Sequence, residues 1–198
     1  MTYEARIQEG RSGAPLLLAL HGTGGNEDQF FDLSRQLLPE ATVVSPRGDV
    51  SEFGAARFFR RTGEGVYDMV DLSRAVEKMA AYVRSFDHDG PIYAFGYSNG
   101  ANILAAMIME HPDLVSRAGL LHPLIPWNPG PVDLRGKEVL ITAGQNDPIT
   151  PWADSQKLLK WFNDQGAEVA SYVHAGGHEL RPEEITALHD LLSQRVAA

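Results

Sequence analysis

The stretch Ile92-Tyr-Ala-Phe-Gly96-Tyr97-Ser98-Asn99-Gly100-Ala-Asn-Ile-Leu104 decides the fold. It begins as an apolar run of strand length, passes through Gly-x-Ser-x-Gly, and continues with the apolar period of a helix. A serine on such a tight turn takes strained backbone angles, and side chains in place of the two glycines would collide with neighbouring backbone. The turn also sets the hydroxyl at the positive end of the following helix. We therefore predict Ser98 as a nucleophile.

Two other interpretations of this turn use the same glycines. A bare Gly-x-Ser-x-Gly pattern is weak, and its weight here comes from the strand before it and the helix after it. The turn could serve tight packing alone. It could also cradle a phosphate, although the Lys-Ser/Thr ending of a P-loop is missing.

Outward from this stretch, short apolar runs alternate with longer segments of helical period, which is typical of βαβ units and a mainly parallel sheet. The predicted strands are residues 16–20, 42–45, 91–96, 118–121, 139–143 and 169–173, with residues 3–9 as an antiparallel edge strand. The predicted helices are residues 27–38, after the N-cap residue Asn26, and residues 68–86, 99–110, 152–165 and 182–196. Residues 48–65 and 122–134 are irregular and favour loops that line a site, with ordinary surface connections as the alternative.

A serine hydroxyl needs a base to take its proton, and the base needs a third group to orient it. Among the 7 histidines, His178 follows the last predicted strand in a glycine-rich turn, where its ring could reach over the serine. His174 is the rival, but it continues the alternation of the strand and should be held by sheet packing. We therefore predict His178 as the base.

The acid is sought just past a buried strand that lies between the serine and the histidine in chain order. Asp147 occupies that place in Gly144-Gln-Asn-Asp147-Pro148. Its alternative role is to cap the next helix, and Asp154 lies one helical turn further on. The oxyanion of the intermediate also needs preorganised donors. We predict the backbone N–H of Asn99 and that of Thr23, in the turn that follows residues 16–20, although this turn could be only a connection.

These four motifs together resemble the phospholipase/carboxylesterase family of α/β-hydrolases, which includes acyl-protein thioesterases. The motifs are His21-Gly-Thr-Gly-Gly25, Gly96-Tyr-Ser-Asn-Gly100, Gly144-Gln-Asn-Asp-Pro148 and Gly176-Gly-His178. The resemblance implies a single α/β-hydrolase domain over residues 1–198, with a mainly parallel sheet, helices on both faces and little or no cap domain. It implies Ser98, Asp147 and His178 as a triad, no metal or organic cofactor, and often a homodimer. Asn99 and Thr23 depart from the thioesterase members, which often carry Gln and Leu there.

The substrate pocket is expected between the two irregular segments. They supply Phe58, Phe59, Leu124 and Trp127, enough apolar surface for an acyl or aromatic group. Plain core packing is the usual fate of such side chains and is the alternative. Arg60 or Arg61 could meet an acidic substrate, or could pair with Glu52, Glu64 or Asp68 at the surface.

Composition excludes several other classes of function. The 198 residues include no cysteine, so a disulfide, a cysteine-ligated zinc and a thiol nucleophile are ruled out. The formal net charge of −9 argues against nucleic-acid binding, which needs clustered Lys and Arg. The apolar run at residues 14–20 is too short to cross a bilayer, and the first residues do not read as a signal peptide. We expect a cytoplasmic protein with no membrane partner.

The sequence thus predicts a serine carboxylesterase acting on short- to medium-chain or aromatic esters through an acyl-enzyme intermediate. Two alternatives remain. One is a thioesterase, a lysophospholipase or another serine hydrolase with the same triad, acting on thioester, amide or carbon–carbon bonds. The other is a ligand-binding protein that keeps the fold and turns over slowly or not at all.

Overall fold

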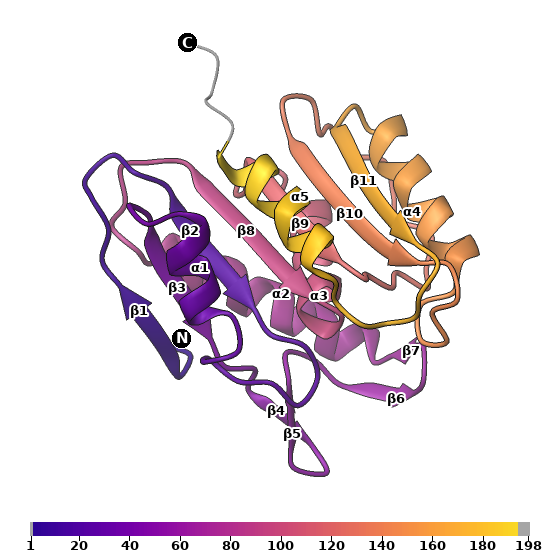
Figure 1. Ribbon diagram of the computed structural model, residues 1–198. Coiled ribbons are helices and arrows are strands. Elements are labelled where there is room, and N and C mark those ends of the chain that lie inside the picture. The colour runs from indigo at the N-terminus through magenta and orange to yellow at the C-terminus, as the bar shows by residue number, and fades with distance from the viewer. Residues whose placement is uncertain (1, 194–198) are drawn as a thin grey trace.

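The computed structural model describes residues 2–193, whose main element is a seven-stranded sheet with the order β1-β3-β2-β8-β9-β10-β11 (Figure 1). Its strands are β1 (Ala5–Gln8), β2 (Leu16–Leu20), β3 (Thr42–Pro46), β8 (Ile92–Tyr97), β9 (Arg117–Leu121), β10 (Glu138–Gly144) and β11 (Glu168–His174). β1 is an edge strand antiparallel to β3, and every other neighbouring pair is parallel. This mainly parallel α/β sheet confirms the predicted fold class.

Helices cover both faces of the sheet, which explains why its central strands are apolar throughout. The helices are α1 (Phe31–Leu37), α2 (Met69–Arg84), α3 (Asn99–Glu110), α4 (Trp152–Asp164) and α5 (Pro182–Ser193). Alternate residues of β2 enter two separate cores. Leu16, Leu18 and Leu20 pack in the core with α2, α3 and α4, whereas Leu17 and Ala19 pack in the core with α1 and α5. Hydrophobic burial on both faces therefore holds the central strands.

Two predicted elements need correction. The helix predicted over residues 27–38 begins only at Phe31, because Asn26 Oδ1 accepts the N–H of Asp28 and closes a turn instead of capping a helix. Residues 48–65, predicted as an irregular loop, contain three short strands. β4 (Val50–Glu52) pairs with β5 (Ala55–Arg57), and β6 (Arg61–Gly63) pairs with β7 (Val66–Tyr67), which follows directly after the segment. The last residues of the predicted helix 182–196 lie outside the described residues.

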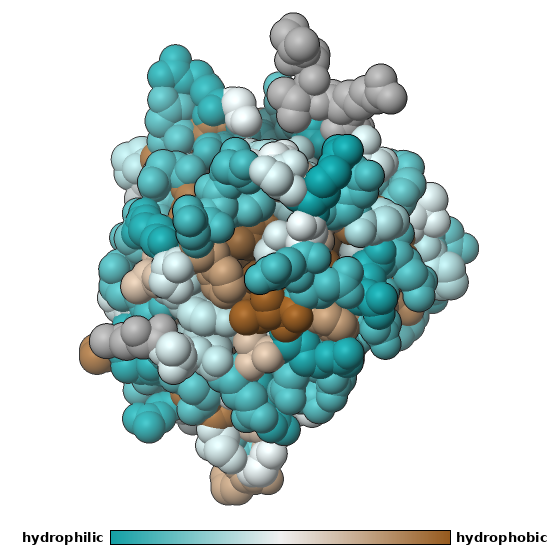
Figure 2. All heavy atoms as spheres, turned by 90° about the vertical axis from the view of Figure 1, so that its left-hand side faces the viewer, coloured by the Kyte–Doolittle hydropathy of each residue, from teal (hydrophilic) through white to brown (hydrophobic). Residues whose placement is uncertain are grey.

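The face of the molecule at the β1 edge is mostly hydrophilic, with small apolar areas between charged and polar side chains (Figure 2). This distribution is ordinary for a domain that keeps its apolar side chains inside. Among residues 2–193, no helix is both long enough and apolar enough to span a membrane.

Candidate active site

Ser98 occupies a strained turn between β8 and α3. Its backbone angles are φ 51° and ψ −115°, a region that costs a residue with a side chain about 1–3 kcal/mol. A Cβ on Gly96 would collide with the backbone of Gly100, and one on Gly100 with the backbone of Leu20. The two glycines thus let β8 and α3 come close enough to force the turn that presents the hydroxyl.

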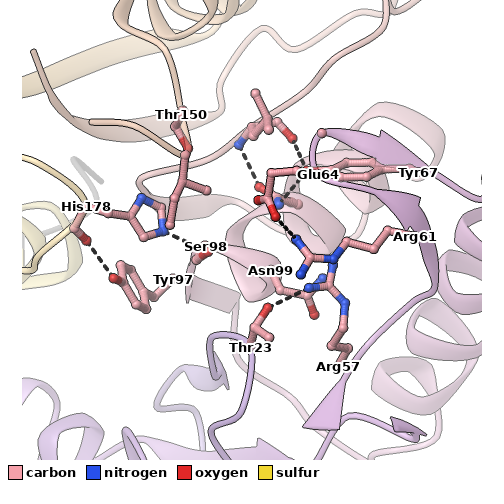
Figure 3. Close-up of a pocket in the computed structure, with 14 residues that line it drawn as sticks. Thr23, Arg57, Arg61, Glu64, Tyr67, Tyr97, Ser98, Asn99, Thr150 and His178 are labelled. Atoms are coloured by element: carbon pink, nitrogen blue, oxygen red, sulfur yellow. Dashed lines mark hydrogen bonds and ion pairs between the residues drawn. The ribbon is translucent and has the colours of Figure 1, made fainter. Parts of the chain in front are cut away.

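His178 lies between Ser98 and Asp147. Its Nε2 is 2.9 Å from Ser98 Oγ (Figure 3). Its Nδ1 is 2.6 Å from Asp147 Oδ2. The histidine comes from the loop between β11 and α5, and the aspartate from the loop after β10. Tyr97, the residue before the serine, donates its hydroxyl proton to the carbonyl of His178 over 2.6 Å. Burial raises the pKa of Tyr97 to about 12, so this hydroxyl stays protonated and ties the His178 loop to β8.

Asp147 is held by hydrogen bonds on both carboxylate oxygens. Oδ1 accepts the backbone N–H groups of Ile149 and Thr150, over 2.8 and 2.9 Å. Oδ2 faces two imidazoles, those of His178 and His122. Burial alone would raise the pKa of Asp147, but these donors outweigh it and lower the pKa, so the carboxylate stays ionised. An ionised Asp147 can orient His178 and stabilise the imidazolium formed when it takes a proton.

His122 and Glu184 extend this network to α5. The Nδ1 of His122 is 3.0 Å from Asp147 Oδ2, and its Nε2 is 2.9 Å from Glu184 Oε1, with all three side chains buried. Burial would lower the pKa of His122, but the hydrogen bonds to Glu184 and Asp147 outweigh it and raise the pKa. Because both ring nitrogens face carboxylate oxygens, the geometry fits a ring that carries both protons. Burial would raise the pKa of Glu184, but its contacts with His122, Thr142 and the backbone of Arg181 together outweigh it and lower the pKa.

Reasoning from the sequence missed His122 and Glu184. A signal for His122 was available, because it follows β9, the strand beside β8, and so lies at the sheet edge that carries Ser98. It has a positive φ of 51°, which a sequence does not reveal. Glu184 had no signal, since an acidic residue in the first turn of a helix is ordinary.

His174 lies apart from the serine, as predicted. It ends β11, where its Nδ1 accepts the N–H of Gly176 over 3.0 Å, and its Nε2 is 3.6 Å from Glu184 Oε2. Its ring therefore supports the turn that carries His178 and the buried acid behind it.

The loop after β2 places a free donor beside the serine. The N–H groups of Gly22, Gly24 and Gly25 are all engaged, but that of Thr23 has no acceptor among residues 2–193, and neither has that of Asn99. Thr23 and Asn99 line the same cavity as Ser98. This arrangement is what an oxyanion hole requires.

His21 holds that loop in place. Its Nε2 accepts the N–H of Gly48 over 2.8 Å, so its Nδ1 carries the proton and donates to the carbonyl of Gly22 over 2.7 Å. The side-chain Oδ1 of Asn99 also accepts the N–H of Phe58 over 2.8 Å, which ties the start of α3 to the hairpin region. His21 and Asn99 therefore hold neighbouring backbone in position through side-chain hydrogen bonds that the sequence alone did not reveal.

The cavity at Ser98 has a volume of about 260 Å³. Its wall combines charged and polar side chains with apolar surface (Figure 3). The residues that line it are Thr23, Arg57, Arg61, Glu64, Gly65, Tyr67, Tyr97, Ser98, Asn99, Asn102, Leu124, Ile149, Thr150 and His178. The predicted loops do line the site. Of the apolar side chains predicted for it, only Leu124 reaches the cavity.

Phe58 and Phe59 are not in the cavity wall, so their predicted contact with substrate was wrong. Both are 0 % exposed, with the Phe58 ring against His21 and the Phe59 ring against Tyr67. Full burial in the core removes more of their apolar surface from water than a cavity wall would. Trp127 lines two other cavities, one beside α2 and one beside α4. Arg57 and Arg61, from the same segment, line the cavity instead.

Some of these side chains could also hold a cation. Ligand atoms lie within 4.8 Å of one another in two groups, one of His122, His174 and Glu184 and one of His122, Asp147 and His178. The imidazole and carboxylate groups of His122, Asp147, His178 and Glu184 already pair as donors and acceptors. Their distances of 2.6 to 3.0 Å are those of hydrogen bonds, which fits a proton network better than ligation of a metal.

A sheet of this topology, with a strained serine between strand and helix and an imidazole between it and an aspartate, defines an α/β-hydrolase. No family model matches the chain. A Bacillus subtilis protein with the name "Putative hydrolase MhqD" is 38 % identical over 185 residues, which cover 90 % of this chain and 92 % of that protein. The chain belongs to the phospholipase/carboxylesterase family of α/β-hydrolases, and this membership makes it an ester hydrolase by class.

Solved structures agree with this assignment. A protein of unknown function from Agrobacterium tumefaciens is 51 % identical with a TM-score of 0.94, over 96 % of each chain. A carboxylesterase from Bacillus cereus is 36 % identical with a TM-score of 0.89, over 94 % of this chain and 92 % of that one. The alignments extend over nearly the whole chain, so the similarity includes the sheet and both helical layers.

The buried ion pairs make the stability of the fold depend on pH. The raised pKa of His122 contributes stability below its ordinary value of about 6.5 that is lost as pH rises through the raised value. The lowered pKa values of Asp147 and Glu184 contribute stability above about 4.5 that is lost as pH falls through those lowered values. The network therefore stabilises the fold most between about pH 4.5 and 6.5.

We expect Glu184→Gln to reduce the free energy of unfolding by about 1–3 kcal/mol at pH 6, because it removes a buried charge partner of His122. The loss should become smaller as pH rises above the raised pKa of His122. There the ring is neutral in the wild type, so the wild type no longer gains from pairing it with a charged Glu184. Urea unfolding at pH 6 and pH 9 measures the difference. The matched control is Glu183→Gln, an exposed neighbour in the same helical turn. Equal losses for the two variants at pH 6 would contradict the proposed charge state of His122.

Proposed function

We propose that the chain is a serine carboxylesterase that hydrolyses short- to medium-chain or aromatic carboxylic esters through an acyl-enzyme intermediate. The observation that carries the proposal is the continuous chain of contacts from Ser98 Oγ through His178 to Asp147, at 2.9 and 2.6 Å. The free N–H groups of Thr23 and Asn99 beside the serine support it further.

In the first half of the reaction, Ser98 Oγ attacks the ester carbonyl while His178 Nε2 takes the hydroxyl proton. The carbonyl oxygen becomes an oxyanion and accepts the N–H groups of Thr23 and Asn99. His178 then gives its proton to the leaving alkoxide, and the alcohol departs. Asp147 stays ionised throughout, since the donors around it lower its pKa. In the second half, water attacks the acyl-enzyme by the same steps and releases the carboxylic acid.

The size of the cavity favours small esters over lipids. A volume of about 260 Å³ is below the range of about 300–1,000 Å³ typical of pockets for drug-sized ligands. A long acyl chain would lie outside such a cavity, whereas a short acyl or single aromatic group fits within it. The lysophospholipase alternative is thus less well supported than the esterase.

The test is a panel of p-nitrophenyl esters with acyl chains of graded length, run beside the matching thioesters. We expect kcat/KM to be highest for the shortest acyl chains and to fall for long ones, and EDTA to leave these rates unchanged. A fluorophosphonate probe should label the wild type at Ser98. No labelling and no turnover of any ester would contradict the proposal, and would favour a ligand-binding protein.

Two further points stay predictions. We propose a homodimer, which is supported by the family resemblance and tested by sedimentation equilibrium. We also propose a cytoplasmic location, which cell fractionation tests.

A further inference from the structure

The cavity beside Ser98 has two guanidinium groups in its wall, which ester hydrolysis itself does not require. Arg57 ends β5 and Arg61 begins β6, and both line the cavity. Figure 3 shows the two guanidiniums side by side, next to Thr23 and Asn99 on one side and Glu64 on the other. The side chain of Arg57 is almost fully buried and that of Arg61 is partly buried. Burying a cation is costly unless it is paired and hydrogen-bonded, so the partners of these two groups matter.

Part of each guanidinium is engaged by the protein. Arg57 donates from Nε to the carbonyl of Phe59 over 3.2 Å and from Nη1 to Thr23 Oγ1 over 2.7 Å. Arg61 donates from Nε to Glu52 Oε1 over 2.9 Å and from Nη1 to Glu64 Oε2 over 2.7 Å. The Nη2 group of each has no acceptor among residues 2–193. The N–H groups of Nη2 on each arginine are therefore available to bind a ligand.

Two carboxylates, those of Glu52 and Glu64, pair with the two guanidiniums, so an entering anion must replace one of them. Glu52 pairs with both guanidiniums. Burial, together with the nearby charge of Arg61, lowers the pKa of Arg57, whose side chain is 4 % exposed. Glu64 balances the remaining charge from the rim, but its side chain is 63 % exposed. An ion pair that is open to water on one side is weak, so an entering anion can replace Glu64 on Arg61.

We propose that the preferred substrates are small carboxylic esters that carry a second, ionised carboxylate. This inference rests on the proposed esterase function. With the ester carbonyl at Ser98, the free carboxylate would bind Arg61, and Arg57 beside it, in the place that Glu64 leaves. A carboxylate matches the planar fork of a guanidinium, which can donate two parallel hydrogen bonds to it. The small volume limits such a substrate to a few carbons between the two groups.

The experiment compares monoethyl succinate with ethyl succinamate, which has the same shape but an uncharged amide in place of the carboxylate. Release of ethanol gives kcat/KM for each. We expect the wild type to favour the charged ester by on the order of tenfold to a hundredfold, the size typical of a hydrogen bond to a charged group. Arg61→Gln should bring the ratio close to one. Glu64→Gln should raise it, because the competing carboxylate is removed.

The matched control is Arg60→Gln, which removes the same charge from an exposed neighbour outside the cavity wall. It should keep the wild-type ratio. A wild-type ratio of one or less, or equal ratios for Arg61→Gln and Arg60→Gln, would overturn the proposal, and hydrolysis of p-nitrophenyl acetate would then show that the esterase function still stands. If p-nitrophenyl acetate is not hydrolysed either, the esterase function fails and this inference fails with it.

Discussion

Replacement of Ser98 by alanine is expected to lower kcat for ester hydrolysis on the order of 10⁴- to 10⁶-fold. The variant loses the oxygen that forms the acyl-enzyme, while the oxyanion donors and the cavity remain. The residual rate should be the small one that binding and the oxyanion hole supply by themselves. Hydrolysis of p-nitrophenyl acetate measures the loss, and the fluorophosphonate probe should no longer label the protein.

The fold of Ser98→Ala should be intact, because the substitution removes only one hydroxyl group. The backbone at φ 51° is equally strained with serine or alanine. Circular dichroism and the unfolding midpoint check this. Ser73→Ala, an exposed serine of α2, is the matched control and should keep full activity. Activity of Ser98→Ala within a few-fold of that of the control would show that the nucleophile lies elsewhere.

His178→Ala should cost on the order of 10⁴- to 10⁶-fold in kcat, because it removes the base 2.9 Å from the serine oxygen. His174→Ala should cost far less turnover. Its ring contacts Gly176 and Glu184, so its loss acts through the turn before His178 and through stability. Steady-state hydrolysis of the same ester by the two variants, at equal folded fraction, separates the roles.

One result for these two variants would contradict the assignment of His178 as the base. An inactive His174→Ala beside an active His178→Ala would contradict the order of the triad. It would also contradict the reading of Gly176 and Gly177 as the point where the chain leaves the sheet. Thermal unfolding of both variants shows whether a loss of activity is merely a loss of folded protein.

Local patterns were sufficient to predict the sheet and to select the three residues, Ser98, Asp147 and His178, that the structure brings into contact. Buried parallel strands are apolar throughout, and the strain of the Ser98 turn requires glycines at 96 and 100, so both leave marks in a single sequence. His178 and Asp147 could be chosen because the carboxyl ends of parallel strands meet at one edge of the sheet. These inferences needed only the order of the motifs along the chain and the periodicity of its apolar residues.

The character of the cavity was not predictable in this way. Phe58 and Phe59 lie beside Arg57 in sequence, and which of these side chains faces the cavity depends on how the hairpin region packs against His21 and Tyr67. Local sequence does not contain that packing. The pairing of His122 with Glu184 depends likewise on the position of α5 over β9 and β10, which is a tertiary contact between distant segments.

The contact between α5 and the buried acid–imidazole network also bears on protein synthesis. The base comes from the loop before α5, and Glu184, which holds His122 behind the aspartate, lies in the first turn of that helix. A nascent chain still lacking this segment has the serine, the aspartate and the oxyanion loop, but not His178, the proposed base. If His178 is the base, as we propose, hydrolysis requires that α5 be synthesised and packed against β9 and β10, and the onset of activity then reports that step.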